Sequence, residues 1–195
     1  MPEASPAGEH RPRSGGLAFL ANAFTLLRVA LVPVIAALLL AGGDTARWWA
    51  FGIFVFAALT DSIDGELARR LVGVTRWGQM ADPAADKALV VGSLGVLALL
   101  GELPWAAVVV IVLREVAVTV QRAVLLRRGI VMPASQFGKL KTISQIVAVL
   151  AYLLPVVPQP VAGATLLVAI VLTIASGLDY AFRGARLQRE LGHAG

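Results

Sequence analysis

Residues 61–86 of the chain read DSIDGELARRLVGVTRWGQMADPAAD, and long apolar segments flank this stretch on both sides. The stretch contains four aspartates, Asp61, Asp64, Asp82 and Asp86. A carboxylate in apolar surroundings is so unfavourable that an opposite charge must accompany it. A divalent cation is the simplest such partner, so the stretch predicts a metal-dependent reaction centre.

The composition indicates the class of protein. Of the 195 residues, 58% are hydrophobic and 15% are charged, whereas a soluble domain carries about 25% charged residues. The apolar residues gather into runs of about 20, the length that crosses a bilayer as a helix. We therefore expect an all-α integral membrane protein with six transmembrane helices, at about residues 22–42, 47–69, 78–101, 104–127, 137–157 and 160–182.

Three parts are expected along the chain. Residues 1–16 are rich in Pro, Gly and charge and predict a disordered N-terminal tail, without the apolar core and cleavage site of a signal peptide. Residues 17–183 form the six-helix catalytic domain, and residues 184–195 form a C-terminal tail. The chain has no cysteine, which excludes disulfides and thiolate metal sites.

The basic residues predict the orientation in the membrane. Arg47 is the one basic residue in the loops of one side. This asymmetry places both termini and the 70–77 connection in the cytoplasm, at the inner (plasma) membrane. It also explains the net charge of +5 without a nucleic-acid partner. The opposite loops and tails hold twelve basic residues: Arg11, Arg13, Arg69, Arg70, Arg76, Arg127, Arg128, Lys139, Lys141, Arg183, Arg186 and Arg189.

Helical spacing brings the four aspartates into two pairs. Residues three or four apart share one helix face, so Asp61 and Asp64 form one pair and Asp82 and Asp86 the other. At about 1.5 Å per residue, both pairs lie about 6 to 12 Å below the cytoplasmic ends of their helices. Hard oxygen ligands without His or Cys favour Mg²⁺, Mn²⁺ or Ca²⁺, and two ions would suit phosphoryl transfer. A structural cation site or an ion-conduction path is the alternative.

The pattern Asp-x2-Asp-Gly-x2-Ala-Arg-x8-Gly-x3-Asp-x3-Asp resembles the signature of the CDP-alcohol phosphotransferase family at every fixed position. The resemblance implies a six-helix membrane enzyme, usually homodimeric, in which an alcohol displaces CMP from a CDP-linked donor. It implies two bound ions, Mg²⁺ or Mn²⁺, held by Asp61, Asp64 and Asp82, with Asp86 as catalytic base and further metal ligand. The CDP-binding residues that it implies are Asn22, Thr25, Asp61, Gly65, Ala68, Arg69 and Gly78.

Softer similarities narrow the branch of the family. The segments 22–28, 114–122, 138–145 and 177–180 resemble those of bacterial phosphatidylglycerophosphate synthases. This implies CDP-diacylglycerol as donor and sn-glycerol 3-phosphate as acceptor. A small dianionic acceptor needs cations close to the metal centre. Such residues lie mostly in the cytoplasmic halves of the spans, and we predict that the acceptor phosphate is bound by Arg28, Arg114, Arg122, Lys139, Lys141 and Gln145.

Other interpretations remain open from the sequence. The acceptor could be inositol phosphate, or phosphatidylglycerol as in cardiolipin synthesis. Basic residues inside spans could instead form ion pairs with nearby acids that only stabilise the helix packing. Glu115 could pair with Arg122 in this way. This structural interpretation is favoured for Lys87. A divalent-cation transporter would need polar groups continuing to the outer face, and the outer halves of the spans hold few. A structural or scaffolding role would not explain why four aspartates lie between apolar segments.

Overall fold

The computed structural model describes the backbone of residues 14–71, 78–127 and 135–192, and the side chains of residues 27–60, 87–127 and 135–187. All regular structure in these ranges is helical, which confirms the predicted all-α class with six helices. The helices are α1 (Ser14–Ala41), α2 (Asp44–Leu71), α3 (Gly78–Leu99), α4 (Trp105–Arg127), α5 (Gln136–Leu153) and α6 (Gln159–Gly192).

The helix ends follow local chain chemistry. Gly42 and Gly43 end α1 with φ angles of 74° and 83°, in the left-handed region that only glycine enters without strain. Gly101 ends α3 in the same way, with φ 75°. Ser135 caps α5, because its side chain accepts a hydrogen bond from the amide of Gly138 at 3.1 Å.

The first and last helices are longer than predicted. α1 begins at Ser14, so residues 14–16, assigned from sequence to the tail, are helical. α6 continues to Gly192, ten residues beyond the predicted end of its span. Hydropathy reports only the apolar part of a helix, and polar residues with good helix propensity extend α6 beyond it. The predicted disorder of residues 1–13 lies outside the described residues.

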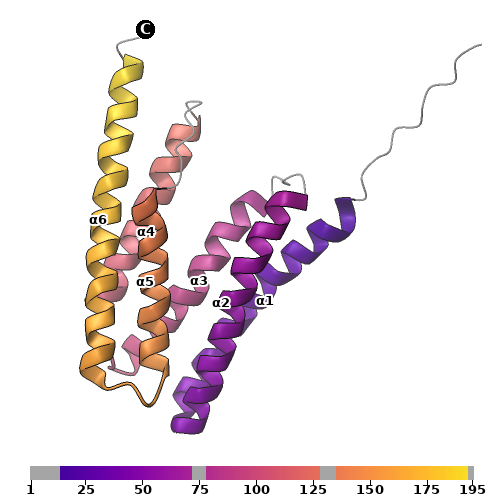
Figure 1. Ribbon diagram of the computed structural model, residues 1–195, viewed down its shortest axis with the longest axis vertical. Helices are drawn as coiled ribbons and strands as arrows, with labels where there is room; N and C mark the ends of the chain where they lie inside the picture. Colours follow the sequence, from indigo (N-terminus) through magenta and orange to yellow (C-terminus); the bar gives the residue numbers. More distant parts are fainter. Residues whose placement is uncertain (1–13, 72–77, 128–134, 193–195) are drawn as a thin grey trace, which may run out of the picture.

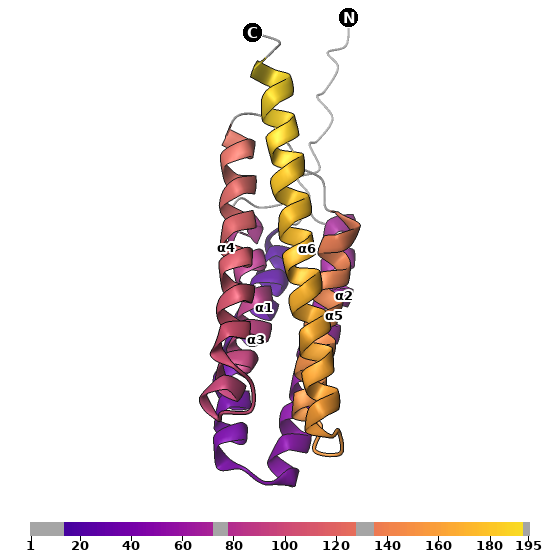
Figure 2. The ribbon, with the colours of Figure 1, turned by 90° about the vertical axis from the view of Figure 1, so that its left-hand side faces the viewer.

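Successive helices run in opposite directions and form two groups (Figures 1 and 2). In the first group α1 packs against both α2 and α3, and in the second α6 packs against both α4 and α5. Contacts of α3 with α4 and α5, and of α2 with α5, join the groups. The end of the bundle where α2 finishes and α3 starts is called the inner end below, and the opposite end the outer end.

A continuous apolar core joins the two groups. It includes fully buried Ile35 of α1, Phe54 of α2, Leu94 of α3 and Leu153 of α5. α1 and α3 approach closely at Gly92, because a Cβ placed there would lie 2.6 Å from Cγ1 of Val32. Such a contact is too short for an undisturbed Cβ, so any larger residue at position 92 would force Val32 or the helices to shift.

A polar clip closes the outer end. The guanidinium of Arg47 donates to the carboxylate of Glu102 and, at 3.0 Å, to the carbonyl oxygen of Tyr152. The amide of Gln159 donates to the carbonyl oxygen of Glu102 at 2.7 Å. The clip therefore ties the start of α2 to the α3–α4 turn, the end of α5 and the start of α6.

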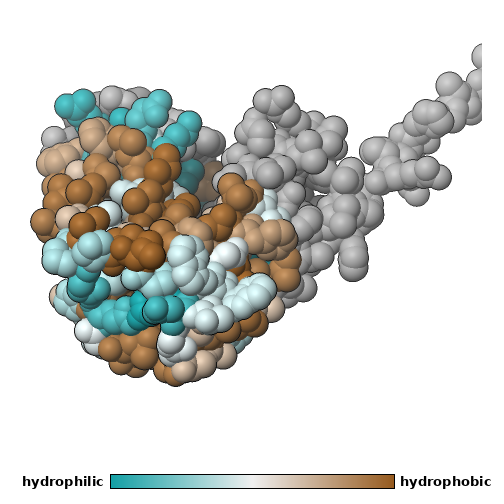
Figure 3. Space-filling model, turned by 60° about the horizontal axis from the view of Figure 1, so that its bottom comes forward, coloured by the Kyte–Doolittle hydropathy of each residue, from teal (hydrophilic) through white to brown (hydrophobic). Residues whose placement is uncertain are grey.

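The flanks of the bundle expose many large apolar side chains, among them Trp49, Leu113 and Phe182 at 64% exposure or more. Figure 3 shows hydrophobic flanks beside a cluster of hydrophilic residues at the outer end. By length and composition, one described helix qualifies as a membrane span, at Gln159–Leu187, and two shorter apolar stretches lie at Leu27–Ala41 and Lys87–Leu99. Apolar flanks of this extent are typical of a surface that faces lipid.

Candidate active site

The helix register brings the four aspartates to the inner end. Asp61 and Asp64 lie about 15 and 10 Å before the end of α2 at Leu71, at 1.5 Å per residue. Asp82 and Asp86 lie about 6 and 12 Å after the first residue of α3. Their side chains are outside the described residues, so the convergence of the carboxylates stays a prediction.

The residues predicted to bind CDP follow the same pattern. They lie on the inner halves of α1 and α2 and at the first position of α3. Their contacts with a nucleotide also stay predictions, since the side chains are outside the described residues. The set comprises Asn22 and Thr25 on α1, Asp61, Gly65, Ala68 and Arg69 on α2, and Gly78 on α3.

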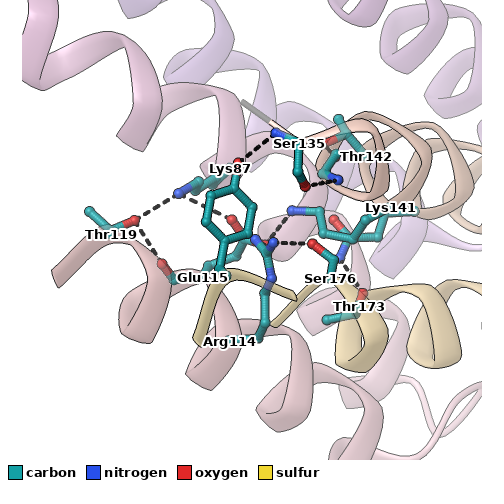
Figure 4. Close-up of polar contacts among 12 residues, drawn as sticks. Lys87, Arg114, Glu115, Thr119, Ser135, Lys141, Thr142, Thr173 and Ser176 are labelled. Carbon is teal, nitrogen blue, oxygen red and sulfur yellow. Dashed lines mark hydrogen bonds and ion pairs between the residues drawn. The ribbon is translucent and has the colours of Figure 1, made fainter. Parts of the chain in front are cut away.

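A cluster of charges around Glu115 is the main polar feature of the described interior (Figure 4). Its carboxylate receives the ammonium group of Lys87 at 3.1 Å, the guanidinium of Arg114 at 3.0 Å and the ammonium group of Lys141. The Glu115 side chain is only 8% exposed. The cluster, named here the Glu115 cluster, therefore joins α3, α4 and α5 by ion pairs inside the bundle.

Neighbouring polar groups hold the cations of the cluster in place. The hydroxyl of Thr119 accepts from Lys87 at 2.9 Å and donates to the backbone carbonyl of Glu115 at 2.7 Å. Arg114 also donates to the hydroxyl of Ser176 on α6 and lies over the ring of Tyr180, 5.5 Å from its centroid. Nε of Arg114 is buried and has no hydrogen-bond partner.

Tyr180 connects the cluster with the start of α5. Its hydroxyl accepts from the backbone amide of Ser135 at 3.1 Å, and its carbonyl oxygen accepts from the side-chain amide of Gln121 at 3.0 Å. Tyr180 is 4% exposed. The inner ends of α4, α5 and α6 are therefore fixed to one another directly beside Arg114.

The Glu115 cluster lies at the depth of the predicted reaction centre. Lys87 follows Asp86 directly and lies about 13 Å along α3. Lys87, which follows the predicted base Asp86 in the chain, is thus an ion-pair partner of Glu115. Two amines, a guanidinium and a carboxylate held together in this way can bind an anion and orient it, because three positive charges exceed the single negative one.

Comparison with known proteins decides the family. The profile of the family "CDP-alcohol phosphatidyltransferase" matches residues 18–175. The chain belongs to this family. The family is membrane-bound, and the resemblance predicted from residues 61–86 is confirmed.

Curated members of the family cover most of the chain. A probable phosphatidylglycerophosphate synthase of Mycobacterium tuberculosis is 45% identical over 175 residues, which is 87% of this chain and 83% of that protein. A CDP-diacylglycerol–glycerol-3-phosphate 3-phosphatidyltransferase of Bacillus subtilis is 39% identical over 83% of this chain and 92% of its own. A protein of the same name from Rickettsia typhi is 33% identical over 83% and 94%.

The structure brings together only part of the set predicted for the acceptor phosphate. Arg114 and Lys141 share Glu115, as described above. Gln145 is buried one turn further along α5 and donates to the hydroxyl of Thr173 at 2.9 Å. Arg28 is buried on α1. Lys139 and Arg122 are exposed.

The sequence did not indicate most of the residues that form hydrogen bonds and ring contacts with the Glu115 cluster. Glu115 was expected to serve Arg122, whereas the structure gives it Lys87, Arg114 and Lys141 as partners. The position of Glu115 on an apolar helix could have predicted such partners, because a buried carboxylate needs several hydrogen-bond donors. The predicted structural role of Lys87 agrees with its ion pair. Ser176 and Tyr180 carry no comparable signal.

A cavity of about 420 Å³ at the outer end is separate from this site. Its lining includes Asp44, Arg47, Glu102, Tyr152 and Gln159, the residues of the outer clip and its surroundings. Among the residues with described side chains, no group of three or more His, Cys, Asp or Glu could hold a metal ion. The four aspartates of residues 61–86 lie outside that set, so the predicted metal centre at the inner end stays a prediction.

Proposed function

We propose that the chain transfers the phosphatidyl group of CDP-diacylglycerol to sn-glycerol 3-phosphate, releasing CMP and forming phosphatidylglycerophosphate. The family and the names of its curated relatives support this activity. The Glu115 cluster supports a phosphate-bearing acceptor, because an excess of positive charge among the described side chains suits such an alcohol better than a neutral one.

The enzyme crosses the inner membrane six times, with the inner end and both termini in the cytoplasm. The apolar flanks and the alternating helix directions support six crossings. The concentration of arginines and lysines in the inner loops supports the orientation. The donor lipid enters from the inner leaflet, with its acyl chains in lipid and its CDP group over the aspartates. A homodimer is the expected assembly.

The donor set fits two Mg²⁺ or Mn²⁺ ions. Four aspartates fall within about 15 Å of the inner ends of two consecutive helices, and hard oxygen ligands suit these ions. Asp61, Asp64 and Asp82 would hold the metal, with Asp86 as a further ligand. When bound, such ions polarise phosphate oxygens and screen the charge of the leaving group.

The chain's own residues position both substrates. The small residues Gly65, Ala68 and Gly78 leave room for the cytidine, and Arg69 offers a forked donor to the pyrophosphate. Asn22 and Thr25 contribute polar groups from α1.

A second group of residues binds the acceptor phosphate. Arg114 and Lys141 form the core of the phosphate site, and four further residues complete it: Arg28, Arg122, Lys139 and Gln145.

The proposed reaction is a single displacement. Asp86 accepts the proton of the 1-hydroxyl of glycerol 3-phosphate. The resulting oxygen forms a bond with the β-phosphorus, which carries the diacylglycerol. The bond from that phosphorus to the bridging oxygen breaks, and CMP leaves with the electron pair.

An acceptor panel tests the proposal. The purified protein is incubated with CDP-diacylglycerol, Mg²⁺ or Mn²⁺, and one acceptor at a time: glycerol 3-phosphate, inositol phosphate or phosphatidylglycerol. CMP release with glycerol 3-phosphate alone is the expected result. Release with inositol phosphate or phosphatidylglycerol, and not with glycerol 3-phosphate, would refute the acceptor assignment.

A further inference from the structure

Glu115 is the one acid among the cations of its cluster. Two of its partners come from other helices, Lys87 from α3 and Lys141 from α5, and Arg114 precedes it on α4. The Lys141 side chain is 6% exposed and its ammonium group pairs with Glu115. Without a nearby anion, three cations at these distances repel one another strongly in a medium of low dielectric constant.

The charges of the cluster do not cancel. Among the described side chains three cations face one carboxylate, so this part of the cluster holds two positive charges in excess. A phosphate monoester dianion would bring two negative charges and neutralise it. The buried Nε of Arg114, which has no partner, offers a further donor to an incoming oxygen.

We propose that Glu115 is a positioning residue for the acceptor: its carboxylate gathers Lys87, Arg114 and Lys141 so that they converge on a phosphate dianion beside Asp86. This inference rests on the proposed function, and it assigns Glu115 a task that none of the predicted phosphate ligands performs. Glu115 does not touch the substrate in this account. It acts through the cations that it holds.

Removal of the carboxylate weakens acceptor binding rather than strengthening it. A neutral residue would raise the excess charge, which attracts phosphate at long range. The same change frees two long lysine side chains, which then repel each other and turn away from the site. Binding of a phosphate depends on convergent donors at hydrogen-bond distance, so the loss of geometry outweighs the gain in charge.

A purely structural role for Glu115 makes a different prediction. An ion-pair cluster that only joins helices would, when broken, lower the melting temperature and disturb both substrates equally. A positioning role affects one substrate. The Michaelis constants for glycerol 3-phosphate and for CDP-diacylglycerol therefore separate the two roles.

The test compares Glu115→Gln with Glu102→Gln, a matched control that removes the acid of the Arg47–Glu102 ion pair at the outer end. For the Glu115 variant, we expect KM for glycerol 3-phosphate to rise about tenfold to a hundredfold, as for a lost hydrogen bond to a charged group. KM for CDP-diacylglycerol should stay within about twofold. The Glu102 variant should change neither constant.

Glu115→Asp provides a second variant that keeps the charge. It withdraws the carboxylate by one methylene group, and we expect KM for glycerol 3-phosphate between the wild-type and glutamine values. An unchanged KM for glycerol 3-phosphate in either folded Glu115 variant, or an equal rise in both constants, would overturn the inference. If the wild-type protein releases no CMP with glycerol 3-phosphate, the proposed function itself fails, whatever the variants do.

Discussion

The proposed chemistry depends most on one side chain, Asp86. The resemblance to the family signature assigns it the proton of the acceptor, and the register of α3 places it next to Lys87, a partner of Glu115. Asp86, the predicted base, is thus directly bonded in the chain to Lys87, a member of the Glu115 cluster. The sequence alone predicted the base and several cations, but it did not predict this link.

Asp86→Asn should keep the fold and stop the reaction. An amide cannot take the proton of the acceptor hydroxyl, and loss of a general base lowers rates by about 10²- to 10⁴-fold. CMP release by the purified variant measures this, and its melting temperature in detergent reports on the fold. Asp44→Asn, which changes an exposed aspartate at the outer end, is the control. An active Asp86→Asn protein would refute the assignment of the base.

Gly177→Ala should disturb Arg114 without touching its charged group. A Cβ at Gly177 would lie 3.2 Å from Cγ of Arg114. Arg114 has little freedom to move, because Glu115 and Ser176 hold its guanidinium. We expect KM for glycerol 3-phosphate to rise several-fold, since shifts of about 1 Å in a positioned group cost up to about 100-fold in rate.

Gly163→Ala on the same helix is the matched control for this prediction, because no atom lies within 4 Å of a Cβ there. If the two alanine variants have equal kinetic constants, then Arg114 does not contribute to acceptor binding in the way proposed.

At the scale of helices, the hydrophobic runs predicted the number of elements and several of their ends. α3 begins at Gly78 and α4 ends at Arg127, as expected. The partners of Glu115 could not be predicted, because a sequence shows which residues share one helix face but not how neighbouring helices are rotated. Lys87 and Lys141 meet Glu115 only after α3, α4 and α5 have come together in the bundle.

The contact between α1 and α3 yields a prediction about stability. Gly92→Ala places a methyl group 2.6 Å from Cγ1 of Val32, a stiff β-branched residue. Overpacking of this kind costs about 1 to 3 kcal/mol. Thermal unfolding in detergent should show a lower melting temperature for Gly92→Ala. Gly95→Ala, where a Cβ meets nothing within 4 Å, should not be destabilised. Equal stability of the two variants would contradict the close helix packing described here.

For the whole molecule, the orientation in the membrane is predicted from the sequence, whereas the structure describes only the arrangement and surface of the helices. The structure supplies apolar flanks, alternating helices and a polar outer clip. The orientation rests on the arginines and lysines of the loops. The metal centre likewise depends on the sequence pattern, since the aspartate side chains are outside the described residues. Geometry and pattern meet where Lys87, a partner of Glu115, directly follows Asp86, the last position of the pattern.

The topology can be tested by labelling, because the chain has no cysteine of its own. Asp44→Cys at the outer end and Arg186→Cys near the end of α6 are both at exposed positions. In intact spheroplasts a membrane-impermeant maleimide should label the Asp44 variant alone. Labelling of the Arg186 variant should require lysis. The reverse pattern would invert the orientation and move the proposed site to the outer face.

The central claim is that the hydroxyl of glycerol 3-phosphate, activated at Asp86, attacks the β-phosphorus of CDP-diacylglycerol. Glycerol 3-phosphate labelled with ¹⁸O at its 1-hydroxyl tests this most directly. Mass spectrometry should find the label in phosphatidylglycerophosphate and none in CMP. Labelled CMP, or CMP release without a labelled lipid product, would contradict the account.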